Sequence, residues 1–233
     1  MKYITAILFA IVTLTAVCRS ESNWSWGKNS SGQLGDGTTT QSAIPIPFGD
    51  STGWAAASCG QGHSVFIKPD GTMWAIGSNN YGQIGNGGTE QVGTAVQIGT
   101  DTNWQSVSCG VGYNLAIKTN GTLWAWGANN RGMLGLGNTT NMTVPIQLGT
   151  DTNWVSVSAG FYHSLGLKSD GTLWAWGYNN VGQLGTSNNT SSSVPVQVGA
   201  ETNWSKISAG YYHSAAIKTD GTLWAWGYNN AGQ

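Results

Sequence analysis

The residues best suited to acid–base or metal chemistry recur fifty positions apart. His63, His163 and His213 share one phase of this spacing, and Tyr113 takes the remaining place. Histidine is a common zinc ligand, but all ligands of one ion must lie within about 2.1 Å of it. Equivalent positions of neighbouring packed sheets are about 10 Å apart. We therefore expect no metal site, and predict a structural histidine that is hydrogen-bonded to backbone at the turn into its strand.

A second repeated set consists of Asp70, Asp170 and Asp220, whose carboxylates could act as general acids or bases. Each precedes a glycine, and Asn120 takes the same place in one repeat. An amide cannot replace a catalytic acid, whereas Asp-Gly and Asn-Gly both favour tight hairpin turns. This set is therefore predicted to form turns.

The rest of the chain offers no further catalytic arrangement. The acids outside these turns show no pairing of the kind that glycoside hydrolysis requires. The sequence has neither a Gly-x-Ser-x-Gly elbow nor a Gly-rich phosphate loop between a strand and a helix. We predict that the protein is not an enzyme and has no catalytic, metal-binding or cofactor-binding residues.

Residues that differ between repeats are better candidates for recognition, because binding residues are often carried by loops on a rigid scaffold. Tyr81 and Arg131 differ at one such loop position. Tyr, Trp and Arg are enriched at interface hot spots, and Phe is enriched at interfaces as a whole. The residues that we predict to bind a partner are six aromatic ones in these loops: Phe161, Tyr162, Tyr178, Tyr211, Tyr212 and Tyr228.

The elements that position these residues follow from a repeat. The stretch Asp170-Gly-Thr-Leu-Trp-Ala-Trp-Gly177 recurs at 220–227 and, with Asn in first place, at 120–127. A weaker copy occupies 70–77, and the closing glycines fall at 27, 77, 127, 177 and 227. A fixed period of this length is typical of repeat architectures.

Within one unit, 144–193, the residue pattern predicts four short strands. These are Val144–Leu148, Trp154–Ala159, Ser164–Lys168 and Leu173–Gly177. Both faces of the last strand are apolar, so its sheet must be covered on both sides. We predict an all-β fold, a β-propeller of four-stranded antiparallel blades. A solenoid is the alternative, although its repeats are usually shorter.

The repeat domain is predicted to span residues 23–233 and to hold about four blades. Repeat phases lie near 27–76, 77–126, 127–176 and 177–226, with a partial repeat at 227–233. We expect an open or partial propeller that is a fragment of a longer gene product. An intact chain of this length would expose apolar blade faces and associate with itself through them.

At the level of motifs, the chain resembles the regulator-of-chromosome-condensation repeat family. The resemblance is carried by Ala159–Ser164, Asp170–Gly177, Gly182–Gly185 and Pro195, and it covers the chain from about residue 23 onward. It implies a seven-bladed propeller, of which this chain would supply a part. Members of the family include a guanine-nucleotide exchange factor on chromatin, a plant ultraviolet photoreceptor and a secreted inhibitor of β-lactamase. The photoreceptor's Gly-Trp-Arg-His-Thr motif is replaced here by Gly160-Phe-Tyr-His-Ser164.

Composition and the N-terminus indicate an exported protein that does not bind nucleic acid. Only 8% of residues are charged, nine Lys and Arg against ten Asp and Glu, so no basic surface is available for phosphates. Lys2 precedes an apolar run from Ile4 to Val17, which predicts a signal peptide at 1–20 and a secreted or cell-surface location, extracellular or periplasmic. Membrane attachment would require lipidation of Cys18.

Cys59 and Cys109 lie one period apart, and their side chains should point the same way round rather than at each other. Both are predicted to be small buried core residues without a disulfide. The function predicted from all these features is a secreted or surface-attached, non-catalytic scaffold that binds an unidentified protein. The alternatives are a carbohydrate-binding propeller, a glycan-active hydrolase or, by family analogy, a guanine-nucleotide exchange regulator.

Overall fold

The computed structural model describes residues 23–48 and 53–233, and in this part of the chain all regular structure is β-strand. The predicted signal peptide and Cys18 lie outside the described residues. Three sheets have four strands each. They are β3 (Ala56–Cys59), β4 (His63–Ile67), β5 (Met73–Gly77) and β6 (Val92–Gln97); β7 (Trp104–Cys109), β8 (Tyr113–Lys118), β9 (Leu123–Gly127) and β10 (Met142–Gln147); and β11 (Trp154–Ala159), β12 (His163–Lys168), β13 (Leu173–Gly177) and β14 (Ser192–Gln197).

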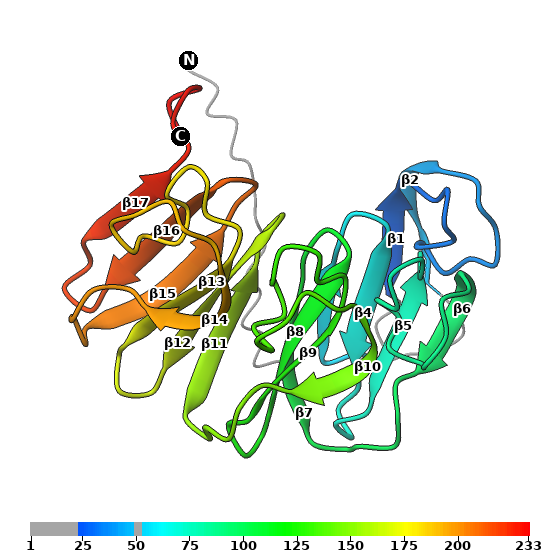
Figure 1. Ribbon diagram of the computed structural model, residues 1–233. Coiled ribbons are helices and arrows are strands. Elements are labelled where there is room, and N and C mark those ends of the chain that lie inside the picture. Colours follow the sequence, from blue (N-terminus) through cyan, green and yellow to red (C-terminus); the bar gives the residue numbers. More distant parts are fainter. Residues whose placement is uncertain (1–22, 49–52) are drawn as a thin grey trace.

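Two smaller sheets stand at the ends of this series. The first pairs β1 (Trp24–Gly27) with β2 (Ser42–Pro47), and the last contains β15 (Trp204–Ala209), β16 (His213–Lys218) and β17 (Leu223–Gly227). Every sheet is an antiparallel meander of consecutive strands. Figure 1 shows the sheets following one another in an arc from β1, in blue, to β17, in red. The predicted all-β fold of propeller blades, open rather than closed, is confirmed.

The grouping of strands differs from the one predicted. The strand that contains Val144 was expected to begin the sheet of Trp154–Ala159, which is wrong. β10 pairs with β9, Ile146 opposite Ala125, so it is the outer strand of the preceding sheet. The backbone N–H of Leu148 also bonds to Leu123 O, 2.8 Å away, which holds the chain to β9 until it crosses to the next sheet. Pro145 lies at an irregularity of this edge strand, where a missing N–H is tolerated.

The core lies between the sheets rather than within any one of them. Trp176 of β13 is fully buried among Leu123, Leu134 and Leu148 of the preceding unit. Its indole Nε1 donates a hydrogen bond of 2.7 Å to Met133 O. Gly135 makes room for it, because a Cβ there would lie 3.0 Å from Trp176 Nε1. Each tryptophan of this phase therefore links its own sheet to the loop that follows the tryptophan strand of the preceding sheet.

These tryptophans are more deeply buried where the surrounding sheets have all four strands. Trp126 and Trp176 have no exposed surface, as predicted, whereas Trp226 of β17 is only half-buried. In the first sheet, which within the described residues has no counterparts of two inner strands, Trp24 and Trp26 are 55% and 61% exposed. Leu184 and its three counterparts in the same loop phase are buried, so this loop does anchor on its blade.

The prediction for the cysteines is half right. Both are free thiols, and Cys109 is buried, but Cys59 is exposed. The Sγ of Cys109 lies 3.3 Å from Ser58 O of the preceding sheet, which covers it. Cys59 has no such cover in the described part of the chain, where the preceding sheet consists of β1 and β2. Within the described residues, no helix is long and apolar enough to cross a membrane.

Candidate functional site

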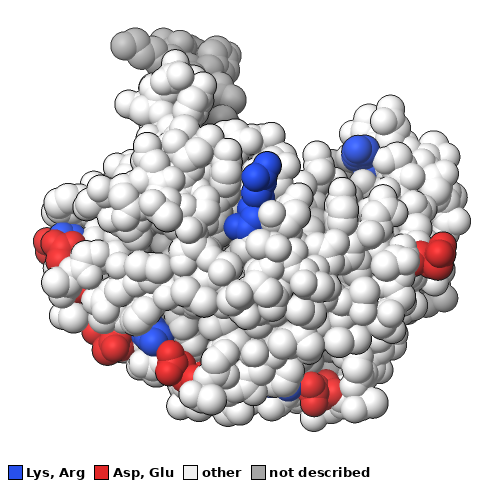
Figure 2. Space-filling view, in the orientation of Figure 1, with Lys and Arg blue, Asp and Glu red and all other residues white. Residues whose placement is uncertain are grey.

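The two ends of the sheets form two different rims. The rim that carries the turns 68–72, 118–122, 168–172 and 218–222 is called the hairpin rim below. The opposite rim carries the connections 60–62, 110–112, 160–162 and 210–212 and the loops after β1, β5, β9, β13 and β17, and is called the aromatic rim. Figure 2 shows acidic side chains mainly along the lower edge and the flanks of one face, often beside a basic one, whereas two basic side chains stand alone on the upper part.

The charges of the hairpin rim are used within the structure. Lys168 Nζ lies 2.7 Å from Asp151 Oδ2 and 4.2 Å from the ring centroid of Trp174. Lys118 and Lys218 repeat this arrangement with an acid and a tryptophan of their own sheets. A lysine whose stem covers tryptophan and whose charge is paired is a packing element, so this rim offers few free charges to a ligand.

The repeated aspartates form turns, as predicted. Thr172 donates to Asp170 Oδ1 through both its hydroxyl, at 2.6 Å, and its backbone N–H, at 3.0 Å. These two hydrogen bonds hold the pKa of Asp170 below its ordinary value, because they stabilise the carboxylate. Asp70 and Asp220 have the same partners, and Asn120 makes the same bonds as a neutral amide. A role that an amide fills equally well is structural.

His63 and His163 connect neighbouring sheets, and the bond to backbone predicted for them is wrong. His63 Nε2 lies 2.7 Å from Asn114 Oδ1, and His163 Nε2 lies 2.9 Å from Ser214 Oγ. The Ser214 hydroxyl donates to Gln183 O, so it accepts a hydrogen bond from His163 Nε2–H. The Nδ1 atoms are buried without a partner. Burial lowers the pKa of both histidines to about 4, and they are neutral at neutral pH.

Tyr113 takes the position of the histidine in its own sheet, and it also forms hydrogen bonds to the following sheet. Its hydroxyl donates to His163 O over 2.6 Å and accepts from Ser164 Oγ over 3.0 Å. The rings of this phase pack directly against a glycine. At Gly160, for example, a Cβ would lie 2.9 Å from His163 Cε1, so a larger residue there would collide with the histidine ring. No group of three His, Cys, Asp or Glu residues in the described part of the chain could hold a metal ion.

The six aromatic residues proposed from the sequence lie together on the aromatic rim. Phe161 stacks on Tyr211, with ring centroids 3.7 Å apart and an interplanar angle of 25°. Tyr162 meets Tyr178 edge-on at 6.2 Å. Tyr212 then links Tyr178, at 6.5 Å, to Tyr228, at 6.4 Å. We call these six residues the aromatic cluster.

The repeat itself brings the aromatic cluster together. The connections 160–162 and 210–212 lie side by side on successive sheets, where Phe161 N donates to Gly210 O over 3.2 Å. The residue that follows each tryptophan strand is held to the connection of its own sheet, since Tyr178 N bonds to Tyr162 O at 2.8 Å. Residues fifty positions apart in two loop phases thus become neighbours. Sequence comparison between repeats found the members, but not their contacts.

The cluster is accessible. Tyr211 and Tyr228 are 54% and 36% exposed, and the other four rings are half-buried. A cavity of about 480 Å³ opens among Tyr178, Val181, Tyr211, Tyr212 and Tyr228. Desolvation by the surrounding rings, with a contribution from Tyr211, raises the pKa of Tyr212. The Tyr212 hydroxyl is therefore neutral at physiological pH and can both donate and accept a hydrogen bond.

Arg131 belongs to the same surface, although the sequence singled it out only as a variable loop residue. Its guanidinium carbon lies 5.0 Å from the ring centroid of Tyr178. Arg131 is exposed and makes no hydrogen bond or ion pair within the described residues. The signal that could have found it is its charge, because the same phase holds Tyr81, Val181 and Ala231 in the other repeats.

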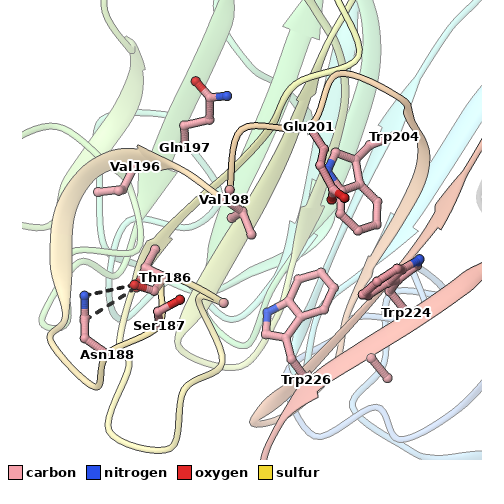
Figure 3. Close-up of a pocket in the computed structure, with 13 residues that line it drawn as sticks. Thr186, Ser187, Asn188, Val196, Gln197, Val198, Glu201, Trp204, Trp224 and Trp226 are labelled. Atoms are coloured by element: carbon pink, nitrogen blue, oxygen red, sulfur yellow. Dashed lines mark hydrogen bonds between the residues drawn. The ribbon is translucent and has the colours of Figure 1, made fainter.

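A larger cavity of about 610 Å³ lies away from this surface, beside the free edge of β17. Figure 3 shows Trp204, Trp224 and Trp226 along one side of it, opposite Thr186, Ser187 and Asn188. In the complete sheet, Trp174 is paired with Gln197 of the outer strand β14. β17 has no such strand in the described chain, and Trp224 is 49% exposed. The cavity thus lies beside an open sheet edge, at the interface between the last two described sheets.

Comparison with known proteins identifies both the repeat and the fold. The model of the regulator of chromosome condensation (RCC1) repeat matches residues 23–67, 70–117, 120–167 and 170–217. A second model of the same repeat matches 54–83, 104–132, 154–183 and 204–233. A search among curated proteins finds no significant match to this sequence.

Solved structures with the same fold include human WBSCR16, which is 27% identical over 92% of this chain and 59% of its own, with a TM-score of 0.80. Prp20p from Saccharomyces cerevisiae, described with its binding to Gsp1p and histones, is 23% identical over 88% of this chain and 53% of its own, with a TM-score of 0.78. Yeast RCC1 (Prp20) bound to Kap60 gives 21% identity, 88% and 52% coverage and a TM-score of 0.75. The chain thus spans a little over half the length of these proteins.

Proposed function

Because this chain belongs to the RCC1 repeat family, we propose that it is a propeller scaffold whose aromatic rim binds a protein partner. The observation that carries the proposal is the gathering of six aromatic side chains from two successive sheets, four of which line one open cavity. Burial of aromatic rings by a partner supplies a large share of binding energy, and Tyr is enriched at hot spots.

The proposed scaffold is non-catalytic and acts outside the cytoplasm. The first part is supported by the structural use of the repeated acids and histidines, which leaves no paired general acid and base in the described chain. The second part rests on Lys2 and the apolar run after it. One structural relative, yeast Prp20, is described as bound to Kap60 and with its binding to Gsp1p and histones, which favours a protein as the class of ligand.

Carbohydrate binding is the second candidate function, because exposed tyrosine rings beside Asn180 could stack on a sugar and bond to its hydroxyls. The exchange-factor activity known in the family is an alternative by analogy alone, since fold does not specify function. It predicts that the protein accelerates nucleotide release from a small GTPase, which a fluorescent-nucleotide assay would detect.

The experiment that tests the proposal starts by capturing partners from the native secretome and purifying the protein that binds most tightly. Its affinity is then measured for the double variant Tyr211→Ala, Tyr228→Ala. We expect a loss of at least about tenfold, because both rings are exposed parts of the cluster. The matched control is Tyr81→Ala, which removes an exposed tyrosine of the same rim outside the cluster and should leave the affinity unchanged. Equal affinity of all three proteins, or binding of polysaccharide alone, would contradict the proposal.

A further inference from the structure

Arg131 gives the aromatic cluster a defined chemical preference. The planar guanidinium lies over the Tyr178 ring, which holds it in place by a cation–π contact while its N–H groups remain free of partners in the described chain. Arg131 also acts electrostatically on Tyr212 in the middle of the cluster. A fixed and unpaired fork of donors beside an apolar platform is suited to a carboxylate, which can accept two parallel hydrogen bonds.

No acid of the described chain neutralises this arginine. Three of the acids form the ion pairs of the hairpin rim, and three more cap its hairpin turns. The other two, Asp36 and Glu90, lie in the loops that follow β1 and β5, and neither is paired with Arg131. Arg131 therefore has no counter-charge among the described residues, and a negatively charged ligand would supply one.

The rings next to Arg131 favour an apolar group adjacent to that negative charge. Tyr178, on which the guanidinium rests, also forms the wall of the cavity of about 480 Å³. Val181 and Tyr228 line the same cavity, and their apolar surface gains by being covered. A neutral sugar would fill the cavity but leave the guanidinium without a counter-charge, whereas an acidic residue followed by an apolar one would satisfy both.

Building on the proposed function, we propose that the aromatic cluster and Arg131 bind a peptide segment in which Asp or Glu stands beside an apolar or aromatic residue. The carboxylate accepts hydrogen bonds from the Arg131 guanidinium, and the neighbouring side chain enters the cavity between Tyr178 and Tyr228. Backbone groups of the segment are within the reach of the tyrosine hydroxyls, which can both donate and accept hydrogen bonds.

The test uses the full chain and an array of short synthetic peptides in which acidic, amide, basic and apolar residues are varied systematically. We expect bound peptides to be enriched in Asp or Glu beside Leu, Phe or Trp, and replacement of the acid by its amide to weaken binding about tenfold. Arg131→Met should remove the preference for the acid, while Arg131→Lys should retain part of it. Lys28→Met is the matched control, because it removes one exposed positive charge of the same rim on the first sheet.

The outcomes separate this inference from the proposed function. Peptide binding that depends on Tyr211 and Tyr228 but is indifferent to the acid and to Arg131 overturns the inference and leaves the binding rim intact. Loss of acid preference in Lys28→Met as well as in Arg131→Met shows a general charge effect and also overturns it. Binding of polygalacturonate, a carboxylated polysaccharide, in place of every peptide overturns both proposals. An array without bound peptides overturns the inference alone, because the proposed function is tested separately with the captured protein.

Discussion

Single residues in this chain mostly join one sheet to the next. His163 bonds to Ser214, Tyr113 bonds to Ser164, and Trp176 bonds to Met133, each across an interface. The first two pairs share one spacing, 51 residues, because the side chain at the position of Tyr113 or His163 bonds to the next position of the repeat on the following sheet. Trp176 instead reaches back 43 residues to the preceding unit. Several groups that look catalytic in the sequence thus serve packing, whereas Arg131 forms no hydrogen bond or ion pair within the described residues.

The buried histidines predict a protein that is destabilised by mild acid. Their pKa in the fold is about 4 against an ordinary value of 6.5, so the unfolded chain binds more protons between these values. Stability is therefore complete above about pH 6.5 and falls as the pH drops toward 4, by up to about 3 kcal/mol per histidine. Urea unfolding at a series of pH values measures this slope.

The variant His163→Tyr provides the control for this prediction. Tyrosine is accommodated in this phase at Tyr113, opposite a serine, and Ser214 stands opposite His163. The variant should fold, bond to the neighbouring sheet and lose about half of the acid sensitivity that the two histidines cause together. A slope identical to that of the unaltered protein would show that His163 does not take up the proton on unfolding.

At the scale of strands, the sequence predicts what is local. The Asp-Gly turn at 170–171 and the alternation in Leu173–Gly177 are enough to define β12, β13 and the hairpin between them. Local sequence does not predict which strand Val144–Leu148 pairs with. Both the preceding and the following strand are possible partners, and the choice depends on where the chain crosses from one sheet to the next. The partner of His163 and the exposure of Cys59 were mispredicted for the same reason, since both depend on the adjacent sheet.

The contribution of each interface tryptophan to the free energy of unfolding should depend on its position in the arc. In Trp176→Phe, the hydrogen bond to Met133 O is lost, and the smaller ring leaves a cavity in a fully buried site. We expect a loss of about 2–4 kcal/mol in the free energy of unfolding, measured in urea. Trp226→Phe removes the same group from a half-buried site and should cost clearly less. Equal losses would show that the interfaces do not differ in packing.

The described chain is a row of sheets whose main contacts are with the neighbouring sheets. In such an array, stability is close to a sum of repeat and interface terms, and the units at the ends have one interface less. The middle sheets carry the most deeply buried residues, whereas Leu223 of β17 is 71% exposed and Trp26 of β1 61%. The aromatic cluster lies on the interface between a complete sheet and the last one, so its geometry depends on the order of both.

Hydrogen exchange measured along the chain tests this gradient. Amides of β8, β9, β12 and β13, which are bonded within complete sheets and covered on both faces, should exchange slowest. Those of β1, β2 and β17 should exchange faster, because their sheets lack a neighbour strand and one apolar face is open to water. Binding of an acidic peptide at the aromatic cluster should slow exchange at 210–212 and around Tyr228, since the peptide would fasten the last sheet to the one before it. Uniform protection from β1 to β17 would mean that the arc unfolds as one cooperative unit, and protection at the cluster that is unchanged by peptide would place the peptide elsewhere.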